Sequence, residues 1–171
     1  MSADLERDLE RIALQERQLV FSHFNAGIAW MLGCELRTLA ESVQASLVID
    51  ISLHDRQLFH CAMQSATPDN ADWVRRKRNT VLRCHKSSYA VGLKCSLEGG
   101  SFHEKTGVNP HDYATHGGGF PITLEGLGCI GAITVSGLPQ REDHMFVVRV
   151  LAEHLGQPLA ELTLEPETGS A

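Results

Sequence analysis

Histidines in the second half of the chain are the residues most able to bind a metal or move a proton. His111 and His116 are separated by four residues, and Asp143 and His144 stand side by side further along. A neutral imidazole is a common metal ligand and can act as a general acid or base near pH 7. No H-E-x-x-H or C-x-x-C accompanies them, so the sequence offers candidate ligands without a complete metal motif. These candidates are His111, His116 and His144.

A basic segment at residues 73–88, WVRRKRNTVLRCHKSS, could bind an anion. At 100° per residue, Lys77 falls inside the apolar arc of the predicted helix, and Ser88 lies on the same side. One interpretation is that Lys77 covers the core with its aliphatic stem while its charge reaches solvent. The other is that Lys77 reaches an anionic ligand between helix and sheet, with Arg76 and Arg83 clamping a carboxylate or phosphate.

The string GLGCIG at residues 126–131 matches the spacing of a dinucleotide-binding loop. That loop must be followed by a helix whose N-terminus holds the pyrophosphate. Here AITVSG follows, and its β-branched residues favour a strand. We therefore expect Gly126 and Gly128 to form a hairpin turn, and Gly131 to let a backbone or ligand approach the strand.

The string HGGG at residues 116–119 is typical of an esterase oxyanion loop. Such an enzyme also needs a G-x-S-x-G nucleophile elbow, which this sequence lacks. Ser136 precedes a predicted helix that carries Asp143 and His144, but without the elbow spacing. We interpret the glycines, Gly118 among them, as a flexible entry into the next strand.

The elements that must position these residues follow from periodicity. Residues 4–17 form a charged helix with one narrow apolar stripe, and Asn25 caps a second helix. Residues 46–53 and 57–64 read as a hairpin, and a helix is expected from Pro68 to about Tyr89. Residues 92–118 predict a short strand, a loop and a turn of helix. A second hairpin then spans FPITLEGLGCIGAITVSG, and a last helix runs from Pro139 to Gly156.

This order of elements predicts an α+β fold with an antiparallel sheet, because strands pair locally and helices lie between the hairpins. We expect the helices to cover mainly one face of the sheet, which leaves the other face for a partner subunit. The predicted organisation is an amphipathic helix at residues 1–18, a single domain at 19–164 and a disordered tail at 165–171.

Composition limits the class of protein. The net charge of −6 argues against a nucleic-acid partner. No apolar stretch approaches the ~18 residues of a membrane-spanning helix, and the charged N-terminus lacks a secretory signal. The five scattered cysteines argue against a disulfide framework and suggest a reducing, cytoplasmic location.

Several long motifs resemble a known family. They are PDNADWVRRKRN, KSSY, DYATHGGGFPI, GAITVSGLPQ and EDH. Together they resemble a family of small cytosolic proteins in the haem-degrading-domain superfamily, the GlcG/HbpS-like group, over most of the chain from Leu19. The resemblance implies a profilin-like or PAS-like sandwich with a five-stranded antiparallel sheet, symmetric oligomers and tetrapyrrole binding in the wider superfamily. The matching positions that become candidate ligand-binding residues are Arg76, Lys77, Ser88, Tyr113, His116, Gly118, Ser136, Asp143 and His144.

Three functions remain open from the sequence. The first is an oligomeric domain that binds a small anionic ligand, with haem as a candidate cofactor and His116 or His144 as the anchoring group. The second is a homo-oligomeric interaction module that docks a protein partner and holds no small ligand. The third is an enzyme in which His116, Asp143 and His144 act as acid, base or metal ligands; no motif names its reaction.

Overall fold

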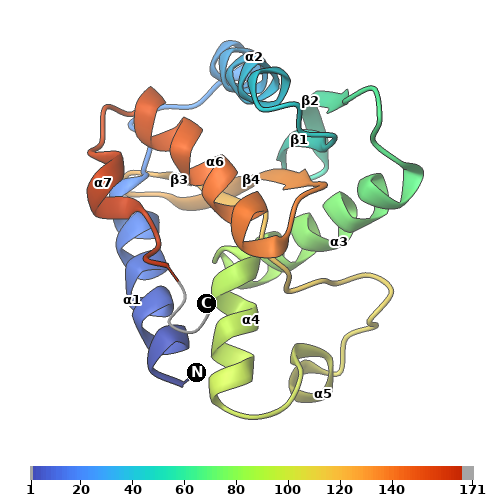
Figure 1. The fold of residues 1–171 in the computed structure, drawn as a ribbon, viewed down its shortest axis with the longest axis vertical. Coiled ribbons are helices and arrows are strands. Elements are labelled where there is room, and N and C mark those ends of the chain that lie inside the picture. Colours follow the sequence, from blue (N-terminus) through green and yellow to red (C-terminus); the bar gives the residue numbers. More distant parts are fainter. Residues whose placement is uncertain (1, 167–171) are drawn as a thin grey trace.

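The computed structural model describes residues 2–166. Helices α1 and α2 precede a β-hairpin, three helices follow it, and a second hairpin leads into the last two helices (Figure 1). This arrangement confirms the α+β class. The elements are α1 (Ser2–Gln18), α2 (Ala26–Ser42), β1 (Val48–Leu53), β2 (Arg56–Ala62), α3 (Pro68–Cys84), α4 (Ser88–Leu97), α5 (Phe102–Thr106), β3 (Gly119–Leu124), β4 (Gly128–Ser136), α6 (Gln140–His154) and α7 (Leu159–Leu162).

The sheet has four antiparallel strands in the order β2-β1-β4-β3, so the expected five-stranded sheet is wrong for the described residues. The segment that was expected to supply a strand, residues 92–118, continues as α4, forms α5 and then runs along α3. There the Arg76 guanidinium donates to the Pro110 carbonyl at 2.9 Å, and the Ala114 amide donates to the Arg76 carbonyl at 3.2 Å. Hydrogen bonds to a helix and its side chains thus replace those of a fifth strand.

The predicted long helix is divided in two. It ends at Cys84, where His85 adopts the left-handed conformation at φ 54°, and a new helix begins after Ser87. The Ser87 hydroxyl accepts from the Ala90 amide, and the Glu16 carboxylate of α1 accepts from the Ser87 amide at 2.7 Å. These caps stabilise a helix start that periodicity alone does not mark.

Helices cover both faces of the sheet, so the expectation of one covered face is also wrong. On one face, Ile49, Ile51 and Ile133 form the main core with α2 and α6. On the other face α3 crosses the strands, and the Arg78 guanidinium donates to the buried Asp50 carboxylate at 3.3 Å. Helix α3 can lie close against this second face because the side chains there are small or polar, as Ser52 is.

The GLGCIG segment forms the predicted hairpin between β3 and β4. Gly126 and Gly128 have positive φ values of 72° and 97°, which turn residues rarely tolerate unless they are glycine. A Cβ on Gly131 would lie 2.3 Å from the Ser52 carbonyl oxygen of the neighbouring strand β1. The close approach at Gly131 is therefore made by a backbone.

The predicted N-terminal helix is confirmed as α1, which lies beside α4 (Figure 1). Its Ile12 is fully buried with Leu93 of α4. Glu165 and Pro166, from the expected tail, contact α1 through Arg7; residues 167–171 lie outside the described residues. Among residues 2–166, no helix has the length and apolar character needed to cross a membrane.

Candidate functional site

A pocket of about 270 Å³ lies where the start of α3, the loop before β3 and the start of α6 meet. It brings together four of the residues expected from the sequence to bind a ligand: Lys77, His116, Ser136 and Asp143. Ser136 ends β4, and the loop that follows it closes one side. The remaining lining residues are Asp69, Asn70, Trp73, Gly137, Leu138 and Gln140.

Lys77 and Asp143 form a buried ion pair in the floor of this pocket. The Lys77 ammonium donates to the Asp143 carboxylate at 2.8 Å and to the Val135 carbonyl at 3.1 Å, with side-chain exposures of 3% and 1% for the pair. The same carboxylate accepts from the amides of Gly137 and Leu138. Lys77 therefore points inward, as predicted, but its charge meets a carboxylate instead of reaching solvent.

Burial dominates the protonation of this pair. Burial lowers the pKa of the Lys77 ammonium below its ordinary value, and Asp143 offsets only part of that effect. Burial likewise raises the pKa of the Asp143 carboxyl, against the opposing influence of Lys77 and of the amides of Leu138 and Gly137. The pair costs desolvation energy and joins α3 to α6 across the end of β4.

Trp73 and His116 lie together at the mouth of the pocket, and Arg76 stacks on Trp73 outside the lining. The Trp73 ring packs against His116 with centroids 4.8 Å apart, and the Arg76 guanidinium lies 4.5 Å above the same indole. Partial burial lowers the pKa of His116, and the positive charges of Lys77 and Arg76 lower it further. The exposed imidazole of His116 is therefore mostly neutral at pH 7 and able to accept a hydrogen bond.

Two helix N-termini face the pocket. Asp69 and Trp73 come from the first two turns of α3, and Gln140 is the first residue of α6. The start of α6 follows Pro139 and has no side-chain cap, so its first amides lack the usual acceptor. The positive ends of both helix dipoles favour an anion here.

The two glycines before β3, Gly117 and Gly118, are tightly packed, which corrects the expectation of a flexible entry. A Cβ on Gly117 would lie 2.0 Å from the Gln140 carbonyl oxygen. A Cβ on Gly118 would lie 2.4 Å from the Val135 carbonyl oxygen and 2.9 Å from the Lys77 ammonium. The loop needs glycine because it passes directly between α3, β4 and α6.

We predict that Gly118→Ala lowers the free energy of unfolding well beyond the cost of a positive φ alone. Gly126→Ala is the matched control, because Gly126 has φ 72° with no atom near a new Cβ, and we expect it to cost about 1 kcal/mol. Gly118 combines φ 123° with a backbone clash, so we expect about 1–3 kcal/mol more. Urea unfolding of both variants measures this difference, and equal losses would contradict the packing argument.

The other predicted site residues lie away from the pocket lining. Ser88 is buried and donates to the His116 carbonyl at 2.6 Å while accepting from the Gly119 amide, so it fixes the loop. Tyr113 packs under the Arg83 guanidinium, 5.8 Å from its ring centre. Arg76 lies above Trp73 as described, and His111 is exposed on the surface. The expected Arg76–Arg83 clamp does not form, since the two side chains stack on different rings.

His144 is enclosed in the core. It is 1% exposed, and its Nε2 lies 2.7 Å from the Gln15 side-chain oxygen of α1. Tyr89 and Phe120 pack beside the ring, and its Nδ1 is buried without a hydrogen-bond partner. Burial lowers the pKa of His144 to about 3. His144 is thus separated from His116, and residues 2–166 contain no group of three or more metal-binding side chains.

Part of the lining was not among the ligand-binding residues expected from the sequence. Asp69 and Asn70 fall at the predicted start of a helix, Leu138 falls in a connecting loop, and Gln140 ends the motif GAITVSGLPQ that carries the family resemblance. Trp73 was noted in the motif PDNADWVRRKRN but assigned to the apolar arc. The signal that points to them is a shared motif: Asp69, Asn70 and Trp73 lie in PDNADWVRRKRN with Lys77, and Leu138 and Gln140 lie in GAITVSGLPQ with Ser136.

Comparison with known proteins extends over most of the chain. The model of the family described as haem degrading protein HbpS-like matches residues 24–152. A UPF0303 protein of Rhizobium meliloti is 52% identical over 162 residues, which cover 95% of this chain and 99% of that protein. A UPF0303 protein of Azotobacter vinelandii is 50% identical over 162 residues, covering 95% and 98%.

Solved structures share the fold. The Ybr137w protein matches with a TM-score of 0.80 and 31% identity, over 86% of this chain and 87% of that one. HbpS matches with a TM-score of 0.63 and 19% identity, over 80% and 93%. A structure described as a PduOC:heme complex matches with a TM-score of 0.66 and 16% identity, over 75% and 93%.

Proposed function

The chain belongs to the family described as haem degrading protein HbpS-like, and from that premise we propose that its Trp73–His116 pocket binds a small anionic ligand. The observation that carries the proposal is the convergence of two helix N-termini on one pocket, one of them uncapped, beside the Arg76 guanidinium. Helix N-termini and guanidinium groups are the usual partners of carboxylates and phosphates.

The mouth and the floor of the pocket have different roles in this proposal. The Lys77 charge is already compensated by Asp143, so Lys77 shapes the floor and the incoming anion meets Arg76 and the start of α6. The neutral imidazole of His116 offers one hydrogen bond, and the Trp73 ring offers an apolar surface. Asp69, which accepts from the Trp73 indole nitrogen at 3.1 Å, opposes the anion from the rim.

Asp69→Asn is expected to tighten the binding of inorganic phosphate or citrate, and Arg76→Gln to weaken it. Each change should alter the dissociation constant roughly two- to fivefold, the effect of one charge in contact with solvent; Asp69 is exposed and Arg76 is half-buried. Titration can be followed by Trp73 fluorescence in a Trp30→Phe background, because these are the two tryptophans of the chain. Asp55→Asn, in the exposed β1–β2 turn, is the control and should change nothing.

The pocket does not fit an enclosed haem. Its volume of about 270 Å³ lies just below the range of roughly 300–1,000 Å³ for ligand pockets, and its floor holds the charged Lys77 and Asp143. His144 cannot reach an iron from its place between Tyr89 and Phe120. At this pocket a haem would contact the chain across the mouth, where His116 is exposed.

Haem is therefore a second candidate ligand, supported by that exposed imidazole and by the heme complex among the proteins of the same fold. A titration with haem, followed by its Soret absorption band, distinguishes this candidate from a small anion. If haem is the ligand, its Soret band should shift with the native protein and with His111→Ala but not with His116→Ala. If neither phosphate, citrate nor haem changes the fluorescence or the Soret band, the proposed pocket has no anionic ligand of these kinds.

A further inference from the structure

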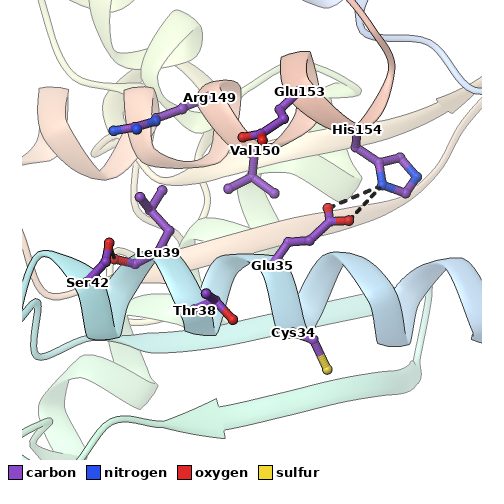
Figure 2. A pocket seen from close by; sticks show the side chains of 9 residues that line it. All are labelled: Cys34, Glu35, Thr38, Leu39, Ser42, Arg149, Val150, Glu153 and His154. Atoms are coloured by element: carbon purple, nitrogen blue, oxygen red, sulfur yellow. Dashed lines mark hydrogen bonds and ion pairs between the residues drawn. The ribbon is translucent and has the colours of Figure 1, made fainter.

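A second cavity lies between α2 and α6 and shares no lining residue with the Trp73–His116 pocket. Its volume is about 630 Å³, within the range typical of small-molecule sites. Helix α2 supplies Glu35 and Leu39, and helix α6 supplies Arg149, Val150 and Glu153 (Figure 2). We call this space the α2–α6 cavity.

The charges of the α2–α6 cavity are separated along its length. Glu35 and Glu153 come from different helices, and the Glu35 carboxylate lies 3.2 Å from His154 Nδ1. Arg149 lies toward the opposite end, and its guanidinium points away from Glu153 in Figure 2. Residues four apart on a helix are placed to pair, yet within the described part of the chain no ion pair joins Arg149 to Glu153. The two side chains therefore do not neutralise each other, and both line the cavity.

Apolar side chains lie between the two charged ends. Leu39 from α2 and Val150 from α6 approach each other from opposite walls (Figure 2). Val150 is 5% exposed, so it belongs to the floor and not to the rim. A ligand in this cavity would meet the carboxylates of Glu35 and Glu153, the apolar side chains of Leu39 and Val150, and the Arg149 side chain at the other side.

We propose that the α2–α6 cavity binds a zwitterion whose ammonium and carboxylate are separated by a short aliphatic chain, such as an ω-amino acid. Its ammonium pairs with Glu35 and Glu153, its carboxylate pairs with Arg149, and its chain packs on Leu39 and Val150. An α-amino acid fits less well because its two charges share one carbon, whereas the Cβ atoms of Arg149 and Glu153 are about 5–6 Å apart before the side chains diverge.

Calorimetric titration with 6-aminohexanoate tests the proposal. The dissociation constant should rise roughly two- to fivefold in Arg149→Gln, and by a similar factor in the separate variant Glu153→Gln. Each variant loses one exposed charge pair with the ligand. Arg37→Gln is the matched control: Arg37 pairs with Glu41 on the outer side of α2, outside the cavity lining, and its removal should leave the affinity unchanged.

Two further probes test the charge separation. Hexanoate and hexylammonium each carry one of the two charges, and norleucine carries both on one carbon; all three should bind more weakly than 6-aminohexanoate. Absence of binding by 6-aminohexanoate at millimolar concentration would overturn the proposal. Equal binding by norleucine, or affinity that does not change in Arg149→Gln and Glu153→Gln, would overturn it as well.

Discussion

Asp143→Ala is expected to lower the free energy of unfolding by about 3–5 kcal/mol, the cost of breaking a buried ion pair by removing one partner. Lys77 is 2% exposed, so its ammonium would either stay charged without a counter-ion or lose its proton. The amides of Gly137 and Leu138 would lose their acceptor at the same time. Urea unfolding at pH 7, followed by far-UV circular dichroism, measures the loss.

The double variant Lys77→Met/Asp143→Asn separates the ion pair from the loop that it supports. It removes both charges but keeps a side-chain oxygen for the amides of the 137–138 loop, so it should be clearly more stable than Asp143→Ala. The exposed pair Arg37–Glu41 supplies the control, since Glu41→Ala should cost no more than about 0.5 kcal/mol. A loss below about 1 kcal/mol in Asp143→Ala would contradict a buried, compensated pair.

His144 is expected to make the protein strongly sensitive to acid. Its folded pKa of about 3 is depressed below the ordinary value of 6.5, because burial disfavours the charged ring and Arg141 adds to this effect. A depressed folded pKa means that the contribution to stability is complete above about pH 6.5 and is lost as the pH falls toward about 3. At about pH 4.5 the loss should be roughly 2–3 kcal/mol, since each unit of difference is worth about 1.4 kcal/mol.

Unfolding free energies measured between pH 7 and pH 4 test this expectation. His144→Gln cannot take up the proton and can still interact with Gln15, so its stability should fall much less over this range. His111→Gln is the control, because His111 is exposed on the surface and its removal should leave the pH dependence intact. If the free energy of unfolding depended on pH identically in native protein and His144→Gln, protonation of His144 would not destabilise the folded state, and the prediction would be wrong.

Local order was largely predictable from the sequence. The predicted N-terminal helix, the Asn25 cap and both hairpins are confirmed, and Asn25 accepts from the Ile28 amide. Rejection of GLGCIG as a dinucleotide loop is confirmed because a strand follows the glycines. These features depend on periodicity and turn chemistry, which act over a few neighbouring residues.

Long-range contacts account for the errors. A helix from Pro68 to about Tyr89 was a reasonable prediction, yet the Glu16 carboxylate from α1 helps a new helix begin after Ser87. Residues 107–118 pack along α3 because Arg76, Asn79 and Thr80 offer hydrogen bonds there, so they add no strand to the sheet. Glu16 is 71 residues from Ser87, and α3 is more than 30 residues from the segment that packs along it. A periodic pattern is recognised over about 11–18 neighbouring residues, so it cannot reveal either contact.

Membership of the HbpS-like family and the residue types of the candidate site were determined by the sequence alone, because the motifs are long and local. Only the tertiary structure decided which of those residues share a pocket. Asp143 and His144 are adjacent in sequence, but the turn of α6 points Asp143 to Lys77 and His144 to Gln15. The protonation of both groups follows from that placement, since burial and nearby charge are properties of the fold.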